Sequence, residues 1–441
     1  MTVELPRPQE IMFINIGQAG CQVGSSYWEL FNEEHGIRND GLAKDQFACG
    51  GLSTRSIYDE TGAYRFVPRC IFVDLEPSII DEIKRSSYRT LFHPDNLLCG
   101  ILDSSNNYGR AHNKLSDKLL DKVLDQVRKQ FELCSGLQGM LCTHSIGGGT
   151  GSGYFTLLIE QLNQLYPKTF KFELSLFPAP RMSNILVEPY NALLATSASL
   201  SEIELAFIMD NEAVWDICKV KLGVDRPSFG NINRLVAQVV SGLTTPIRFK
   251  GQMQGDMIEF QTNLVAYPRL HFPLITFSPI LTAENARFDL LKTDDMTQDL
   301  FRWDHSFVKC DLSNGRYMSA ALLFRGDVDL LDVRRAVTLI KSRIRFASWC
   351  PTGIKLDLND SKQAQVSGSD LARLPKSCCM VANHTSIQDA WGTVIRKFEL
   401  LYRKKAFIHW FVGEGVEENE FQLCREELAY MMKDYEEASA D

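Results

Sequence analysis

The sequence is organised around Ser145-Ile146-Gly147-Gly148-Gly149-Thr150-Gly151-Ser152-Gly153. The apolar run at residues 139–144 predicts a buried strand before this stretch, and the spacing at residues 154–162 predicts a helix after it. Five glycines in seven residues allow positive φ angles and leave the backbone N–H groups open to a ligand. These groups would lie at the positive end of a helix, where phosphate binds well. The side chains of Ser145 and Thr150 add hydroxyls, so the stretch predicts a phosphate-binding turn.

A flexible surface loop is the plainer interpretation of such a glycine-rich stretch. Its position between a strand and a helix favours phosphate binding. The stretch lacks both the Gly-Lys-Ser/Thr ending of a P-loop and the GxGxxG dinucleotide fingerprint. Phosphate bound here would therefore be held by backbone amides and not by a loop lysine.

Composition excludes several classes of protein. With 441 residues, 45% of them hydrophobic, the chain is long enough for two or three domains. The balance of 47 basic and 55 acidic residues gives a net charge of −8, which argues against general nucleic-acid binding. Twelve cysteines form no CxxC pair, so neither zinc nor a disulfide framework is indicated. Residues 1–16 show no signal-peptide pattern and no apolar run could span a membrane; we expect a cytoplasmic protein without a membrane partner.

A second strand–glycine–helix junction lies near the N-terminus. The apolar run Ile11-Met12-Phe13-Ile14-Asn15-Ile16 leads directly into Gly17-Gln18-Ala19-Gly20 and then into a helix. This is how the first turn of a Rossmann-like sheet is built, although the glycine spacing is not the dinucleotide fingerprint. Gln18 and Gln22 lie at the mouth of the turn, where they are either ligand contacts or ordinary surface glutamines.

Carboxylates follow another predicted strand, Cys70-Ile71-Phe72-Val73-Asp74-Leu75-Glu76-Pro77. Asp74 and Glu76 at its carboxyl end would lie beside the phosphate site and could serve as Mg²⁺ ligands. A solvated strand end, or a cap for the following helix, is the alternative. Strands alternate with helices throughout this part of the chain, which predicts a parallel α/β sheet with its ligand loops on one edge.

Further polar side chains follow later predicted elements. Glu188 and Asn211 could hold a ribose and a base edge, although each could equally be a helix cap. Phe229 could stack on a base and Asn233 could hydrogen-bond to one. The pattern from residue 230 to 249 predicts a long buried helix that joins this domain to the next.

The second half has a mixed pattern. Strands are expected at residues 274–280, 317–324 and 344–349, polar loops at residues 40–62 and 359–376, and helices over the tail. Asp256 and Glu259 are three residues apart, so they share one face of a helical first turn. They are either capping acids or, if they point at another molecule's phosphate, a pair that orients or deprotonates water.

Taken together, the motifs resemble the tubulin family. The matching stretches occur in family order: Gly17-Gln18-Ala19-Gly20, Phe72-Val73-Asp74-Leu75-Glu76-Pro77, residues 147–153, Val187-Glu188-Pro189-Tyr190-Asn191, Asp210-Asn211-Glu212-Ala213, Phe260-Gln261-Thr262-Asn263-Leu264-Val265 and Trp349-Cys350-Pro351-Thr352-Gly353. The acid at Glu259, the extended loop at residues 359–376 and the segment at residues 409–415 are similar to the α branch of the family.

The resemblance implies a Rossmann-like GTP-binding domain over residues 1–249, an α+β intermediate domain over 250–384 and a helical region over 385–441. It implies GTP contacts from Gln18, Gln22, Glu76, Asn106, Ser145, Gly148, Gly149, Thr150, Gly151, Asn184, Glu188, Asn211, Phe229 and Asn233, and a Mg²⁺ ion near Asp74, Glu76 and Asp103. Asn184 and Phe229 stand where the family usually has threonine and tyrosine.

The resemblance also implies partners: β-tubulin in a heterodimer and in head-to-tail microtubules, together with microtubule-associated proteins and motors in the cytoplasmic cytoskeleton. The chain's own GTP would be buried and kept, while Glu259, supported by Asp256, would act on the β-subunit GTP of the next dimer. A divergent regulatory tubulin that caps or nucleates is the alternative, motivated by Lys250 and Phe288. A dinucleotide-dependent oxidoreductase is a third, but it lacks the fingerprint.

Overall fold

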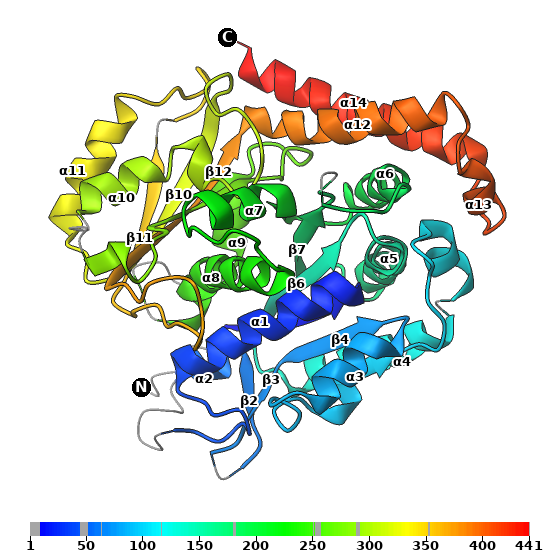
Figure 1. Ribbon diagram of the computed structural model, residues 1–441, viewed down its shortest axis with the longest axis horizontal. Helices are drawn as coiled ribbons and strands as arrows, with labels where there is room; N and C mark the ends of the chain where they lie inside the picture. The colour runs from blue at the N-terminus through cyan, green and yellow to red at the C-terminus, as the bar shows by residue number, and fades with distance from the viewer. Residues whose placement is uncertain are drawn as a thin grey trace, which may run out of the picture.

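The computed structural model describes residues 9–44, 52–62, 64–115, 117–179, 182–249, 251, 257–287, 292–351 and 353–440. It contains a six-stranded sheet, a four-stranded sheet and a two-stranded sheet, joined by a long central helix and covered at one side by C-terminal helices (Figure 1). Among the described residues, no helix combines the length and apolar character needed to cross a bilayer.

The larger sheet has the strand order β5-β4-β1-β6-β7-β8, and every neighbouring pair is parallel. Its strands are β1 Glu10–Ile16, β4 Cys70–Asp74, β5 Leu97–Cys99, β6 Leu137–Ser145, β7 Phe170–Phe177 and β8 Leu205–Asp210. The helices around it are α1 Gly17–His35, α3 Pro77–Arg85, α4 Asp117–Leu133, α5 Phe155–Leu165, α6 Glu188–Ser199, α7 Asn211–Val220 and α8 Phe229–Arg248. The predicted Rossmann-like parallel sheet is confirmed.

Both faces of this sheet are buried, which explains the unbroken apolar sequence of its first strand. Side chains alternate along β1, so that Phe13 packs in the core with α1 and α8, while Ile14 packs in the core with α4, α5 and α6. Because the strands are parallel, their carboxyl ends lie on one edge of the sheet, where the loops to the following helices begin.

The second sheet is mixed, with the order β11-β10-β12-β9. Its strands are β9 Leu274–Ser278, β10 Tyr317–Gly326, β11 Ile354–Asn359 and β12 Lys376–His384, and its helices are α9 Met257–Leu264, α10 Thr293–Asp299 and α11 Leu330–Lys341. The strand expected at residues 344–349 was wrong: this segment forms only an isolated bridge between Phe346 and Tyr317, and the edge strand is β11. The sequence pattern missed β11 because its residues alternate between apolar and polar, as they can in an edge strand with one solvent-exposed face.

The expectation of an open loop over residues 40–62 was also wrong in part. Its second half forms α2 Leu52–Arg55 and β2 Tyr58–Glu60, which pairs with β3 Phe66–Pro68. Ile57 and Tyr58 are fully buried against the large sheet's core. These two apolar side chains anchor an otherwise polar segment, because both pack in that core.

The C-terminal helices are α12 Gln388–Tyr402, α13 Ile408–Val412 and α14 Glu418–Ser439. Helices α12 and α14 run side by side along one edge of the molecule and pack on α6 (Figure 1). Their buried residues, such as Trp391 and Leu428, belong to the same core as Ile14 and the other side chains on that face of β1.

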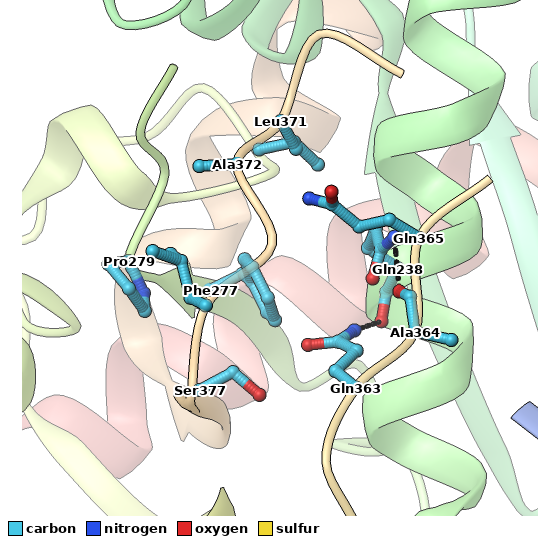
Figure 2. Close-up of a pocket in the computed structure, with 10 residues that line it drawn as sticks. Gln238, Phe277, Pro279, Gln363, Ala364, Gln365, Leu371, Ala372 and Ser377 are labelled. Carbon is cyan, nitrogen blue, oxygen red and sulfur yellow. Dashed lines mark hydrogen bonds between the residues drawn. The ribbon is translucent and has the colours of Figure 1, made fainter. Parts of the chain in front are cut away.

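The loop between β11 and β12 lies against the central helix. Figure 2 shows Gln363 donating from Nε2 to the backbone carbonyl of Gln238 at 3.0 Å, and Gln238 donating to the carbonyl of Ala364 at 3.3 Å. Arg234 donates to the carbonyl of Gly368 at 2.6 Å. The cavity left between loop, helix and β9 is about 20 Å³, room for about one water molecule.

A buried ionic cluster joins the two sheets through this helix. Glu34 of α1 accepts from Arg248 at the end of α8 at 2.6 Å and from Arg325 of β10 at 2.9 Å. Ser241 donates to the same carboxylate at 2.7 Å, and Arg248 lies over the ring of Phe31, 4.3 Å from its centroid. Burial alone would raise the pKa of Glu34, but the two guanidiniums outweigh it and lower this pKa to about 2.

Candidate functional site

A cavity of about 370 Å³ lies at the carboxyl edge of the large sheet, where the ends of β1, β4, β6 and β7 meet the start of α1. It is lined by Gln18, Gln22, Asp74, Glu76, Asp103, Asn106, Ser145, Gly148, Gly149, Thr150, Gly151, Glu188, Asn211, Phe229 and Asn233. The structure thus brings all but one of the residues expected to contact a nucleotide or its Mg²⁺ around one cavity. None of the described residues that line it is Lys or Arg.

The glycine-rich stretch forms the floor of this cavity, but its glycines serve a different purpose from the one expected. None of them has a positive φ; Gly149, for example, is helical at φ −70°. They are needed for close approach: a Cβ on Gly151 would lie 2.4 Å from the carbonyl oxygen of Ser145, and one on Gly153 would lie 2.3 Å from that of Tyr108. A Cβ on Gly148 would meet nothing within 4 Å, so this residue borders open space.

The start of α1 forms a second wall. Gly17 has a φ of +72°, which turns the chain from β1 directly into the helix. The residue before it, Ile16, provides no side-chain cap, and Gln18 and Ala19 of the first turn line the cavity. The first N–H groups of this helix are therefore a place where an anion would be stabilised.

Carboxylates gather at one end of the cavity. Asp74 is only 3% exposed, and its burial raises the pKa of its side chain to about 7. Its Oδ1 accepts from the backbone N–H of Glu76 at 3.3 Å, and Ser78 donates to Oε1 of Glu76 at 2.6 Å. Asp103 also lines the cavity, close enough for its charge to raise the pKa of Asp74 further. Glu76 is the residue before α3, but its side chain makes no capping bond, so the capping alternative does not describe it.

The donor set at this end consists of oxygens alone, which suits Mg²⁺. Among the described residues, no group of three or more His, Cys, Asp or Glu side chains is arranged to hold a metal ion by itself. Asp74, Glu76 and Asp103 would hold a Mg²⁺ ion if a bound ligand supplied further oxygens.

The loop that carries Asp103 contains a residue that the sequence did not single out. Ser104 is 2% exposed, lines the cavity, and has its Oγ 3.2 Å from Oγ1 of Thr150. The next two residues, Ser105 and Asn106, have φ angles of 52° and 56°, and Asn107 donates to the carbonyl of Ser104 at 3.1 Å. This tight turn presses the loop against the glycine-rich stretch.

At the other end, the wall is apolar and amide-rich. Phe229 and Asn233 project from the first turns of α8, whose cap is Ser228, and Phe229 is 60% exposed. Asp210 caps α7, accepting from Glu212 N–H at 2.8 Å, so Asn211 is not the cap of this helix.

Glu188, in the first turn of α6, accepts from Ser183 at 2.6 Å, and burial raises the pKa of its carboxyl. Ser183 and Ile185 line the cavity in place of Asn184, which is exposed and does not line it. The backbone N–H of Ile185 donates to Oγ of Ser183 at 3.1 Å, and the side chain between them is exposed; no sequence pattern indicated this arrangement.

Glu259 lies elsewhere. It is in the first turn of α9, does not line this cavity, and is ion-paired with Lys355 of β11, its side chain about one-third exposed. Asp256, Lys250 and Phe288 lie outside the described residues. Any chemistry of Glu259 must therefore act on something other than a ligand in this chain's own cavity.

Comparison with known proteins agrees with this geometry. Residues 10–219 match the family model described as the GTPase domain of the Tubulin/FtsZ family, and residues 268–396 match the Tubulin C-terminal domain. The chain is 47% identical over 435 residues to the Tubulin alpha-2 chain of Caenorhabditis elegans, with 98% of this chain and 97% of that protein aligned.

Proposed function

The chain belongs to the tubulin family, and we propose that it is an α-type subunit that binds GTP with Mg²⁺, pairs with β-tubulin and polymerises head-to-tail into cytoplasmic microtubules. The single observation that carries the proposal is the cavity at the carboxyl edge of the parallel sheet, where the described residues supply nucleotide-type contacts from seven separate segments of the chain. A head-to-tail contact is heterologous and propagates into a filament.

Each wall of the cavity would bind a different part of the nucleotide. The amides of the glycine-rich stretch and the start of α1 would hold the phosphates, assisted by the hydroxyls of Ser145 and Thr150. Asn211 and Asn233 would read the base edge, with Phe229 stacked on the base face. Mg²⁺ beside Asp74, Glu76 and Asp103 would neutralise phosphate charge, since none of the described lining residues is Lys or Arg.

Glu259 would act in trans on the β-subunit GTP of the next dimer. A water oxygen forms a bond to the γ-phosphorus, the bond to the β–γ bridging oxygen breaks, and the proton leaving the water passes to the Glu259 carboxylate; GDP and phosphate result. The position of Glu259 outside this chain's own cavity supports this division of labour, with Asp256 in support. Hydrolysis then follows assembly, because the base arrives only with the neighbouring dimer.

The test is co-expression with a β-tubulin, followed by nucleotide analysis and electron microscopy after GTP is added. We expect a heterodimer with retained GTP that forms tubes, in which Glu259→Gln reduces phosphate release per polymerised dimer by at least tenfold. Glu418→Gln is the matched control, because Glu418 also lies in the first turn of a helix and is ion-paired with a lysine, Lys405.

Three outcomes would count against the proposal. Normal hydrolysis by Glu259→Gln polymers would refute the trans-acting base. A heterodimer that binds GTP but only caps or blocks growing microtubules would support the regulatory alternative. Absence of nucleotide from the purified chain would refute the nucleotide site itself.

A further inference from the structure

Two loops face each other across the phosphate end of the cavity, and they are joined at two points. On the far side, Asn191 donates to the carbonyls of Asn106 at 2.8 Å and Gly147 at 2.9 Å. On the cavity side, the link is the contact between the hydroxyls of Ser104 and Thr150. Asn191 is fully buried and does not line the cavity, so the loop spacing has a support that is independent of the two hydroxyls.

The two hydroxyls share one hydrogen bond, and its direction matters. Each hydroxyl has one proton and can accept through its oxygen. If Thr150 donates to Ser104, its proton is not available to a ligand. If Ser104 donates to Thr150, the Thr150 proton is free to point at a ligand oxygen.

The surroundings decide between these directions. Among the described residues, the structure gives the Ser104 hydroxyl a second acceptor besides Thr150, Oδ1 of Asp103, at 3.5 Å, a long and weak contact compared with 3.2 Å to Thr150. A phosphate oxygen beside Thr150 is a far stronger acceptor than the neutral Ser104 oxygen, because it is charged. A ligand phosphate therefore turns the Thr150 proton towards itself, and Ser104 becomes the donor behind it.

We propose that Ser104 is a positioning residue for nucleotide binding: it donates its proton to Oγ1 of Thr150 and so fixes the Thr150 hydroxyl as a donor to a phosphate of the bound nucleoside triphosphate. The inference rests on the proposed function of the cavity as a GTP site. Aligned hydroxyls polarise each other, so the bond to phosphate is stronger than Thr150 alone would make. Ser104 itself need not touch the ligand.

The experiment measures how fast the purified heterodimer loses this chain's GTP. The β-subunit site is first exchanged to GDP, and the remaining GTP is counted by chromatography at intervals after dilution into nucleotide-free buffer with constant Mg²⁺. We expect Ser104→Ala to lose GTP roughly two- to tenfold faster than wild type, the effect of removing one neutral hydrogen bond, because Thr150 loses the hydroxyl that orients and polarises it. Ser105→Ala is the matched control, because it removes an exposed hydroxyl from the same turn, outside the cavity lining.

A double-mutant cycle separates positioning from general damage. Thr150→Ala should also lose GTP faster, and Ser104→Ala added to it should change nothing further, because the proton that Ser104 orients is gone. If Ser104→Ala gives no heterodimer, Ser104→Cys replaces it, since the thiol has similar size but donates weakly.

Each contrary result has a distinct meaning. Wild-type heterodimer that retains no GTP would overturn both the proposed function and this inference. Wild type that retains GTP, with Ser104→Ala equal to Ser105→Ala, would overturn the positioning role alone. Effects of Ser104→Ala and Thr150→Ala that simply multiply would also overturn it, because independent contacts behave that way.

Discussion

Replacing Glu34 by Gln should destabilise the protein strongly. The carboxylate of Glu34 is enclosed between the guanidiniums of Arg248 and Arg325, with both ion pairs at most 1% exposed. Gln keeps the shape but removes the negative charge, so two buried cations lose their counter-charge. Removing one partner of a buried ion pair costs about 3–5 kcal/mol.

The expected shift in melting temperature follows from the size of the chain. Unfolding entropy is about 2.1 cal/mol/K per residue, which for 441 residues is roughly 0.9 kcal/mol/K if the chain unfolds as one unit. A loss of about 3–5 kcal/mol then lowers the melting temperature by roughly 3–6 °C. Differential scanning calorimetry of the purified heterodimer measures this shift directly.

The neighbouring glutamate provides the control. Glu33 pairs with Lys44 at 2.7 Å, but both side chains are more than 40% exposed. A surface pair of this kind contributes about 0–1 kcal/mol, so Glu33→Gln should shift the melting temperature by about 1 °C or less. Equal shifts for Glu33→Gln and Glu34→Gln would refute the reasoning, because the two differ mainly in burial.

Three further outcomes are expected. Burial and the nearby guanidiniums lower the pKa of His35 from 6.5 to about 3, and the pKa of Glu34 is lowered from 4.5 to about 2. The unfolded chain therefore binds more protons than the folded chain, and stability should fall as pH drops from about 6.5 towards 4. Calorimetry across that range would show this fall, and His35→Phe should reduce its slope. Gly149→Ala should abolish recovery of nucleotide-bound heterodimer, because its Cβ would lie 2.6 Å from Oγ of Ser104 and 2.7 Å from the backbone nitrogen of Asn107. Gly148→Ala should fold normally, because its Cβ would meet nothing within 4 Å, and soluble yield and bound nucleotide distinguish the two variants. Ile57→Ala should cost about 2–5 kcal/mol in chemical denaturation, and a cost below about 0.5 kcal/mol would mean that the segment is not anchored by this side chain.

The parts of the site built on strand ends were predictable from sequence. An apolar run followed by glycines and then a helical pattern indicates a strand–turn–helix edge, and parallel strands place all such edges together. That is why Gln18, Asp74 and Thr150, distant in sequence, meet around one cavity. Their assignment to GTP and Mg²⁺ remains a prediction until the ligand is measured.

The other features of the site and the fold depend on contacts between distant segments, which leave no pattern in the local sequence. Ser104 acquires its place only because a turn with two left-handed residues presses it against another loop. Asn184 and Ser183 are adjacent polar residues, and only the local backbone path, with Ile185 N–H bonded to the Ser183 hydroxyl, decides which of them faces the cavity. The edge strand β11 was missed because its alternation includes charged residues such as Lys355, which a polar loop also contains.

The way the β11–β12 loop is held has a consequence for how its sequence can drift. Two of its bonds to α8 run from helix side chains, Arg234 and Gln238, to backbone carbonyls of the loop, at Gly368 and Ala364. A carbonyl is present whatever the side chain, so these two bonds constrain the sequence of the helix and not that of the loop. In a library of variants, small side chains at position 364, which packs against the core, should be tolerated more often than substitutions at Gln238.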